Sequence, residues 1–190
     1  MSSLHAIPRA VQRDEPWANG AGNTTVILRE PDAADWRVRA SVAKVERVGP
    51  FSELPGTQRT LVPLDAPMTL RFPDGSERTA ARFGVLRFEG APAPTGLLPG
   101  GPTRDFNLML RNGARGEALP HPLADSMVLP PEAGVRWLVY LDSGHAALRI
   151  DGEPRLGLSP QDAALATANS GTPGILIEGA GEIVLVKLYA

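Results

Sequence analysis

Proline and glycine recur at short intervals along the whole chain, with 19 prolines and 20 glycines in 190 residues. Proline interrupts a helix and glycine weakens one, so long helices are disfavoured almost everywhere. Many of the segments between them alternate apolar and polar residues, which is the period of a β-strand. We therefore predict an all-β chain of short strands joined by turns, a sandwich or a barrel with few short helices.

The composition is that of a globular chain without excess charge. Apolar residues make up 43% of it and the formal net charge is −2, so it can bury a core and offers no basic surface to nucleic acid. It lacks an apolar run of membrane-spanning length and a secretory leader pattern. We predict no nucleic-acid partner, no membrane partner and a cytoplasmic location. Because cysteine is absent, disulfides, thiolate metal sites and a cysteine nucleophile are excluded.

The clearest strand pattern lies at residues 105–111, after a Gly-Gly-Pro turn. One face is apolar and consists of Phe106, Leu108 and Leu110. The opposite face is unusually polar and consists of Asp105, Asn107, Met109 and Arg111. In an antiparallel sheet the apolar face normally packs on the core, and the polar face turns to water or to a cavity. The direction of this polar face therefore decides the functional interpretation.

An approximate internal repeat has an offset of 77 residues. Residues 59–65, with the strand and Asp-Gly turn that follow, resemble residues 136–142 and their continuation. Each copy predicts a strand, a turn, a second strand and a hairpin. We predict a double jelly-roll of the cupin type, in which residues 1–190 form one bicupin unit with cupin-like modules at 10–113 and 114–190.

Three segments are less regular. Residues 112–134 are rich in proline and glycine and predict an irregular crossover. Residues 174–188 predict a plain hairpin around Gly179-Ala180-Gly181. Residues 158–166 fit either a short helix that begins at Ser159-Pro160 or a turn that enters a strand.

Motifs for catalysis are missing. Cupin enzymes usually hold a divalent metal with two or three histidines and a carboxylate, whereas this chain has His5, His121 and His145, far apart and without a His-x-His pair. No serine lies in a nucleophile elbow. We predict no metal, no cofactor and no catalytic residue. Acid-base chemistry by carboxylates stays open, because a sequence does not show which carboxylates meet in space.

Five blocks of the first half resemble the HutD/Ves family, at residues 17–24, 39–45, 49–59, 88–90 and 101–109. The Gly-Pro-Phe-Ser and Asp-Phe-Asn sequences are the specific ones. The resemblance covers most of residues 10–115, and the second half matches only as a generic cupin module. It implies a metal-poor, two-module cupin fold, an association with histidine degradation in some bacteria, and a role in sensing or buffering an intermediate such as formylglutamate.

Polar groups at the junctions of loops and strands form the predicted ligand site. Arginine can hold a carboxylate with two N–H groups, while Asn and Ser orient the rest of a ligand. Arg59 is the residue expected to pair with the ligand carboxylate. Trp17 and Phe51, which lie in glycine-rich loops, are expected to close the end of a barrel. The predicted ligand-binding residues are Asn19, Thr24, Arg39, Ser41, Phe51, Arg59, Asp105, Asn107 and Met109.

The leading hypothesis is a metal-independent cupin, not an enzyme, that binds a small anionic metabolite as a regulator linked to histidine utilisation. Formylglutamate is the first candidate ligand. The alternative is a cupin isomerase, hydrolase or dioxygenase acting on a small acid, which stoichiometric iron, manganese or zinc would favour. A scaffold that binds another protein through a sheet edge would expose a large apolar patch. A homodimer stays open, because cupin sheets often pair across a dimer.

Overall fold

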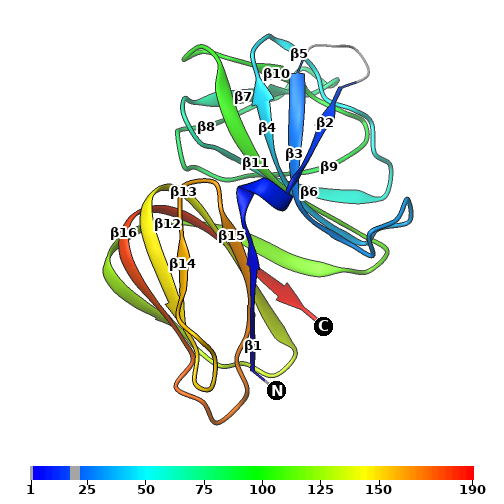
Figure 1. Cartoon of the computed structure of the whole chain (residues 1–190). Helices are drawn as coiled ribbons and strands as arrows, with labels where there is room; N and C mark the ends of the chain where they lie inside the picture. The colour runs from blue at the N-terminus through cyan, green and yellow to red at the C-terminus, as the bar shows by residue number, and fades with distance from the viewer. Residues whose placement is uncertain (1, 18–21) are drawn as a thin grey trace. The chain divides into compact units, whose positions relative to one another are not determined.

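The computed structural model describes residues 2–17 and 22–190, and these are almost entirely antiparallel β-structure (Figure 1). The chain divides into two compact units. We call Arg13–Ala114 the N-terminal unit, and Met1–Gln12 together with Arg115–Ala190 the C-terminal unit. The helical element of the described residues is one 3-10 turn, η1 (Arg9–Val11). The prediction of an all-β chain with few short helices is confirmed.

The N-terminal unit contains two antiparallel sheets, with strand orders β2-β3-β4-β11-β6-β9 and β5-β10-β7-β8. Apolar residues of both sheets, among them Leu61 of β6 and Leu70 of β7, belong to one buried cluster, so the sheets face each other across it. The strands are β2 (Arg13–Pro16), β3 (Gly22–Glu30), β4 (Val38–Val45), β5 (Gly49–Pro50), β6 (Thr57–Pro63), β7 (Met68–Arg71), β8 (Glu77–Ala80), β9 (Leu86–Glu89), β10 (Thr95–Leu97) and β11 (Thr103–Arg111).

The C-terminal unit is one six-stranded sheet of order β1-β15-β13-β16-β12, with β14 paired to β13. The first strand of the chain pairs with β15, from Ser3 opposite Thr167 to Ile7 opposite Ala163. The N-terminal residues therefore complete the sheet formed by the end of the chain. The strands are β1 (Ser3–Ile7), β12 (Arg115–Leu129), β13 (Val135–Arg149), β14 (Leu156–Leu158), β15 (Ala163–Thr167) and β16 (Ile175–Tyr189).

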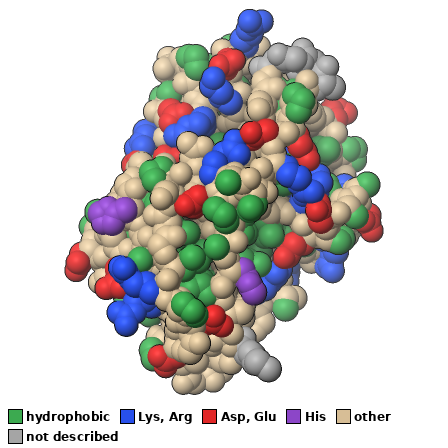
Figure 2. Space-filling view, viewed as in Figure 1, with side chains coloured by type: hydrophobic (Ala, Val, Ile, Leu, Met, Phe, Trp, Pro, Cys, Tyr) green, Lys and Arg blue, Asp and Glu red, His purple; other side chains and the backbone are tan. Residues whose placement is uncertain are grey.

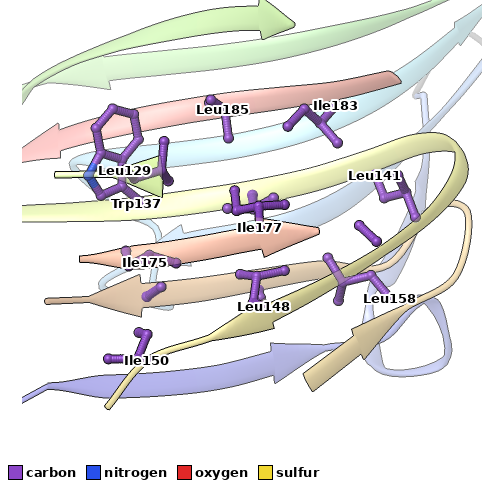
Figure 3. Packing of buried hydrophobic residues seen from close by; sticks show 14 of the residues in the cluster. Leu129, Trp137, Leu141, Leu148, Ile150, Leu158, Ile175, Ile177, Ile183 and Leu185 are labelled. Carbon is purple, nitrogen blue, oxygen red and sulfur yellow. The ribbon is translucent and has the colours of Figure 1, made fainter. Parts of the chain in front are cut away.

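The long strands of the C-terminal unit bend around a buried apolar core. Val139 and Leu148, from the two halves of β13, belong to the same buried cluster, and Figure 3 shows Leu148 near Ile177 within it. A register shift between Leu141 and Ser143 marks a bulge in β13. Bulges and glycines bend strands, so this sheet can curl around its own side chains.

The prediction of a hairpin at residues 174–188 is wrong, because β16 continues through this segment and pairs with both β12 and β13. Gly179 and Gly181 have φ values of 147° and 144°. A Cβ atom at either position would collide with the facing backbone of β13. These glycines permit a close approach of two strands and do not mark a turn.

The prediction of an irregular crossover at residues 112–134 is also wrong, because β12 is a strand of 15 residues. Pro120 lies opposite Val184, and Pro122 lies opposite Glu182, within its ladder with β16. Since β12 is at the end of the sheet, a proline can direct its missing N–H group to the unpaired side. The ambiguous residues 158–166 form the turn-and-strand alternative, with β14 ending at Leu158 and β15 beginning at Ala163.

Surface charge and chain hydropathy agree with the composition. On the face in Figure 2, Lys and Arg side chains are interspersed with Asp and Glu and do not gather into a stripe. Within the described part of the chain, no helix has the length and hydropathy needed to cross a membrane.

Candidate ligand-binding site in the N-terminal unit

Three neighbouring strands extend the polar face of β11 into a continuous surface. β11 pairs with β4 on one side and with β6 on the other, and Met109 lies opposite both Arg39 and Arg59. Asn107 lies opposite Ser41 of β4. Residues directly opposite each other share a face of the sheet. Because neighbouring strands are about 4.8 Å apart, the Cα atoms of Arg39 and Arg59 are roughly 10 Å apart.

This surface forms one wall of a cavity of about 510 Å³, a volume within the usual range of small-molecule sites. The polar face of β11 therefore turns to a cavity. The lining comes wholly from the N-terminal unit and consists of Glu15, Pro16, Trp17, Thr24, Arg39, Ser41, Ala43, Val45, Arg47, Val48, Gly49, Pro50, Phe51, Ser52, Leu54, Arg59, Asn107 and Met109.

Arg59 is held in the cavity wall by aromatic rings and one amide. The residue is 4% exposed, and its Cζ atom lies 4.9 Å from the ring centroid of Phe51 and 5.1 Å from that of Phe88. Its Nη2 atom donates a hydrogen bond of 2.9 Å to Oδ1 of Asn107. Burial lowers the pKa of Arg59 to about 10, so the guanidinium keeps its charge at neutral pH. Cation–π contacts and one charged hydrogen bond therefore orient a buried cation.

Asp105 lies behind Asn107 on the same face of β11. It is fully buried, and its Oδ1 atom accepts a hydrogen bond from Nδ2 of Asn107. Burial raises the pKa of Asp105 to about 7, although the charge of Arg59 and the hydrogen bond from Asn107 oppose the rise. A carboxyl group without solvent favours its neutral form. Asp105 is thus a buried acid that titrates near neutral pH.

Arg39 reaches the cavity from β4 and belongs to a chain of ion pairs. Its Nη2 atom lies 3.0 Å from Oε2 of Glu15, whose Oε1 atom lies 3.0 Å from Nη1 of Arg29. The Arg39 side chain is 16% exposed, and burial lowers the pKa of its guanidinium while Glu15 opposes this effect. Its Nη1 atom also contacts Sδ of Met109 at 4.0 Å. The single carboxylate of Glu15 is therefore shared by two arginines, and this wall of the cavity keeps a positive charge.

Aromatic side chains close other parts of the cavity. Nε1 of Trp17 donates a hydrogen bond of 2.7 Å to Oγ1 of Thr24. The Trp17 ring lies close to Gly22, where any side chain would collide with it. Trp17 and Phe51, which were expected to close the end of a barrel, both line the cavity.

Unpaired polar atoms gather on this surface. The buried atoms Nε of Arg39, Oγ of Ser41, Nε of Arg59 and Oδ2 of Asp105 have no hydrogen-bond partner among residues 2–17 and 22–190. Buried polar groups are normally paired, and those that are not call for an explanation. Donors from β4 and β6, the strands on either side of β11, are therefore available to a ligand in this cavity.

The structure brings most of the predicted site residues together. The predicted residues in the lining are Thr24, Arg39, Ser41, Phe51, Arg59, Asn107 and Met109. Asp105 contacts Asn107 from behind and is not part of the lining. Asn19 lies outside the described residues. Sequence reasoning missed Glu15 and Arg47, which also line the cavity. Glu15 forms ion pairs with arginines on other strands, and such pairs leave no local pattern.

These features define a cupin-like β-barrel protein with a cavity in its N-terminal unit. The HutD family model matches residues 9–185, and the chain belongs to the HutD family. Protein Ves of Cronobacter sakazakii is 35% identical over 97 residues, which are 50% of this chain and 54% of that protein. The chain thus spans about half the length of the curated relatives it matches. The resemblance to the HutD/Ves family is confirmed.

Solved structures support the same fold. A conserved protein of unknown function from Pseudomonas aeruginosa PAO1 is 26% identical, with a TM-score of 0.84 over 99% of this chain and 98% of that one. HutD from Pseudomonas fluorescens SBW25 is 24% identical, with a TM-score of 0.77 over 98% of each chain. A bacterial pirin from Escherichia coli, in complex with nickel(II), is 10% identical, with a TM-score of 0.70 over 98% of this chain and 99% of that one.

The cavity lining does not fit the metal that cupin folds often hold. In the described ranges, no group of three or more His, Cys, Asp or Glu side chains could bind a metal ion. His5, His121 and His145 all lie in the C-terminal unit. Glu15, the carboxylate among the lining residues, is ion-paired with two arginines. Imidazole and carboxylate ligands suited to a transition metal are therefore not gathered in this lining.

Proposed function

We propose that the N-terminal unit binds a small anionic metabolite in its cavity, and that the chain acts through this binding as a regulator linked to histidine utilisation. Arg59 pairs with a carboxylate of the ligand. N-formyl-L-glutamate is the first candidate. In this proposal the chain is a receptor and performs no chemistry on its ligand.

One observation carries the proposal: Arg39 and Arg59, on strands on either side of β11, reach the same cavity. A buried N–H group needs a hydrogen-bond partner, and the Nε atoms of both arginines lack one among the described residues. An anion supplies that partner. Because arginine offers two parallel N–H donors, a carboxylate is the anion that its geometry favours.

The shape of the candidate ligand agrees with the arrangement of donors. Formylglutamate has two carboxylates and one formamide, and the cavity wall has two arginines separated by Met109. Ser41 and Asn107 lie opposite each other in the next row of this wall, two residues along β4 and β11 from Arg39 and Met109, and can bond to an amide. The link to histidine utilisation is supported by the family match and by the likeness in fold to HutD of Pseudomonas fluorescens.

Calorimetry on the full chain tests this proposal. We expect N-formyl-L-glutamate to bind, and Arg59→Ala to weaken binding by about 1.5–3 kcal/mol, the worth of a hydrogen bond to a charged group. Arg87→Ala is the matched control, since Arg87 is an exposed arginine on β9 of the same unit. Glutarate and its dimethyl ester separate charge from shape, and the ester should not bind.

Two results would contradict the proposal. Absence of binding heat for N-formyl-L-glutamate and for glutarate with the parent chain removes the ligand class. Equal losses for Arg59→Ala and Arg87→Ala would place the anion outside the cavity.

An enzyme that acts on a small acid is the second candidate function. It is favoured by the pKa of Asp105, which burial raises to about 7, because strongly shifted acids often occur at catalytic sites. Asp105 does not belong to the cavity lining, however, and a catalytic acid must reach its substrate. Proton NMR of N-formyl-L-glutamate incubated with the chain would reveal product if this second function is the right one.

A further inference from the structure

A chain of buried side chains leads from the cavity to Asp105. Nη2 of Arg59 donates to Oδ1 of Asn107 at 2.9 Å, and Nδ2 of Asn107 donates to Oδ1 of Asp105. The Asn107 amide thus directs its acceptor to the cation and its donor to the acid. Arg59, Asn107 and Asp105 are 4%, 2% and 0% exposed. Low solvent access strengthens the electrostatic coupling along this chain.

Asp105 depends on one nearby cation. Arg59 of β6 is the charged group that acts on it. Arg39 of β4 lies farther along the surface and is ion-paired with Glu15 of β2. Arg111, at the end of β11, donates to backbone carbonyls that precede β4. β7, β8 and β9, which complete the core, contribute apolar side chains to it. The protonation state of Asp105 therefore depends on the charges close to Arg59.

A ligand carboxylate at Arg59 would place two anions near one guanidinium. Like charges that share a buried site disfavour ionisation of the weaker acid. Asp105 can respond by taking up a proton, since burial already raises its pKa to about 7. Its Oδ2 atom, which has no partner in the described part of the chain, is a position for that proton.

We propose that Asp105 takes up a proton when an anion binds beside Arg59, and so makes the affinity of the cavity depend on pH. This inference rests on the proposed function. Asp105 is a positioning residue here, because it acts on the ligand through Asn107 and Arg59. When Asp105 is neutral, the Arg59 guanidinium interacts with the ligand alone. When Asp105 is ionised, its carboxylate competes with the ligand for the Arg59 guanidinium. Affinity is therefore highest at low pH and falls as the pH rises through neutrality.

The experiment is calorimetry of N-formyl-L-glutamate with the full chain near pH 7 in two buffers of different ionisation enthalpy. The difference in heat should correspond to uptake of part of a proton per ligand. Affinity should be about tenfold weaker near pH 8 than near pH 6, as linkage predicts for one acid that is ionised in the free site and neutral in the complex. The parent chain alone suffices for this measurement.

Two variants assign the proton. Asp105→Asn keeps the hydrogen-bond acceptor for Asn107 and should bind with an affinity independent of pH. Asp65→Asn is the matched control, since Asp65 is ion-paired with Arg104 in the same unit and lies outside the cavity lining. It should keep the proton uptake of the parent chain.

The outcomes separate this inference from the proposed function. Binding without proton uptake overturns the role of Asp105 and leaves the receptor intact. Proton uptake that persists in Asp105→Asn, or that disappears in Asp65→Asn, assigns the proton to another group and also overturns it. Absence of binding for the parent chain at each pH overturns both.

Discussion

The two units share a strand arrangement and differ in what fills them. β11 lies between β4 and β6 in the N-terminal unit, and β16 lies between β12 and β13 in the C-terminal unit. Ile177 and Leu185 of β16 belong to a buried apolar core, and Figure 3 shows both among its side chains. Asn107 and Met109 of β11 line a cavity. The same pairing of strands therefore supports either an apolar core or a cavity with a partly polar wall, and a few side chains decide which.

The internal repeat makes this comparison sharper. Residues that occupy the two cores correspond at an offset of 78, as Leu61 with Val139 and Leu70 with Leu148. The offset of 77, which comes from sequence identity, is one residue shorter. Because a shift of one residue exchanges the two faces of a strand, the offset of 77 matches the core face of the first strand in one copy with the opposite face in the other. At the offset of 78, Arg59 of the cavity corresponds to Trp137 of the apolar core. A buried cation in one unit thus stands where the other has a packed indole.

The largest expected effect comes from placing an amide in the apolar core. Ile177 is 0% exposed, and Ile177→Asn removes apolar volume and buries an unpaired amide. We expect a loss of about 4–6 kcal/mol in the free energy of unfolding, measured by urea denaturation. Asn107→Leu, in the cavity wall, is the matched reverse change and should cost less. Equal costs would show that the two interiors tolerate polarity alike.

A second change converts the cavity wall to the apolar type. The triple variant Arg59→Met, Asn107→Leu, Asp105→Leu replaces a buried polar network by apolar groups. Such replacements are often neutral or stabilising by about 1–4 kcal/mol, so the variant should unfold at equal or higher urea concentration. It should also lose binding of N-formyl-L-glutamate. A stability loss would mean that the network holds the N-terminal unit together.

The pH dependence of stability tests the N-terminal unit without a substitution, because Asp105 belongs to this unit. The pKa of Asp105 is about 7 in the folded chain against 3.8 for an ordinary aspartate, so the folded state holds a proton that the unfolded state releases. Stability from this group is complete below the lower value and is lost as the pH rises through the higher one. Between about pH 5 and pH 8 we expect a loss of about 2–3 kcal/mol in urea denaturation. Asp105→Asn should remove this part of the slope, and an unchanged slope would exclude Asp105 as its source.

The smallest effect concerns the aromatic wall of the cavity. Thr24→Val removes the acceptor for Nε1 of Trp17 at nearly constant volume. The expected cost is about 1 kcal/mol, the worth of one hydrogen bond, together with a shift in Trp fluorescence. Thr25→Val is the control, because the Thr25 hydroxyl bonds to Asp14 in an exposed position. A cost no larger than that of the control would show that the wall does not need this bond.

The sequence was most informative where the signal is local. The alternation at residues 105–111 correctly predicted a strand, and the Asp74-Gly75 turn joins β7 to β8 as expected. Predictions based on proline and glycine were wrong where tertiary contacts accommodate these residues inside strands. Pro120 is tolerated in β12 because that strand is at the end of its sheet, and Gly181 marks a close approach of strands.

The sequence by itself determined the all-β class and the polarity of each strand face, because backbone geometry makes side chains alternate with a period of two. Tertiary structure alone decided which face meets a cavity. Both faces of β11 are buried, with Phe106 and Asp105 each 0% exposed, so burial preference could not choose between them. The tertiary structure also brings Glu15 next to Arg39 and β1 next to β15. Such pairings depend on residues far apart in the chain, and no local pattern records them.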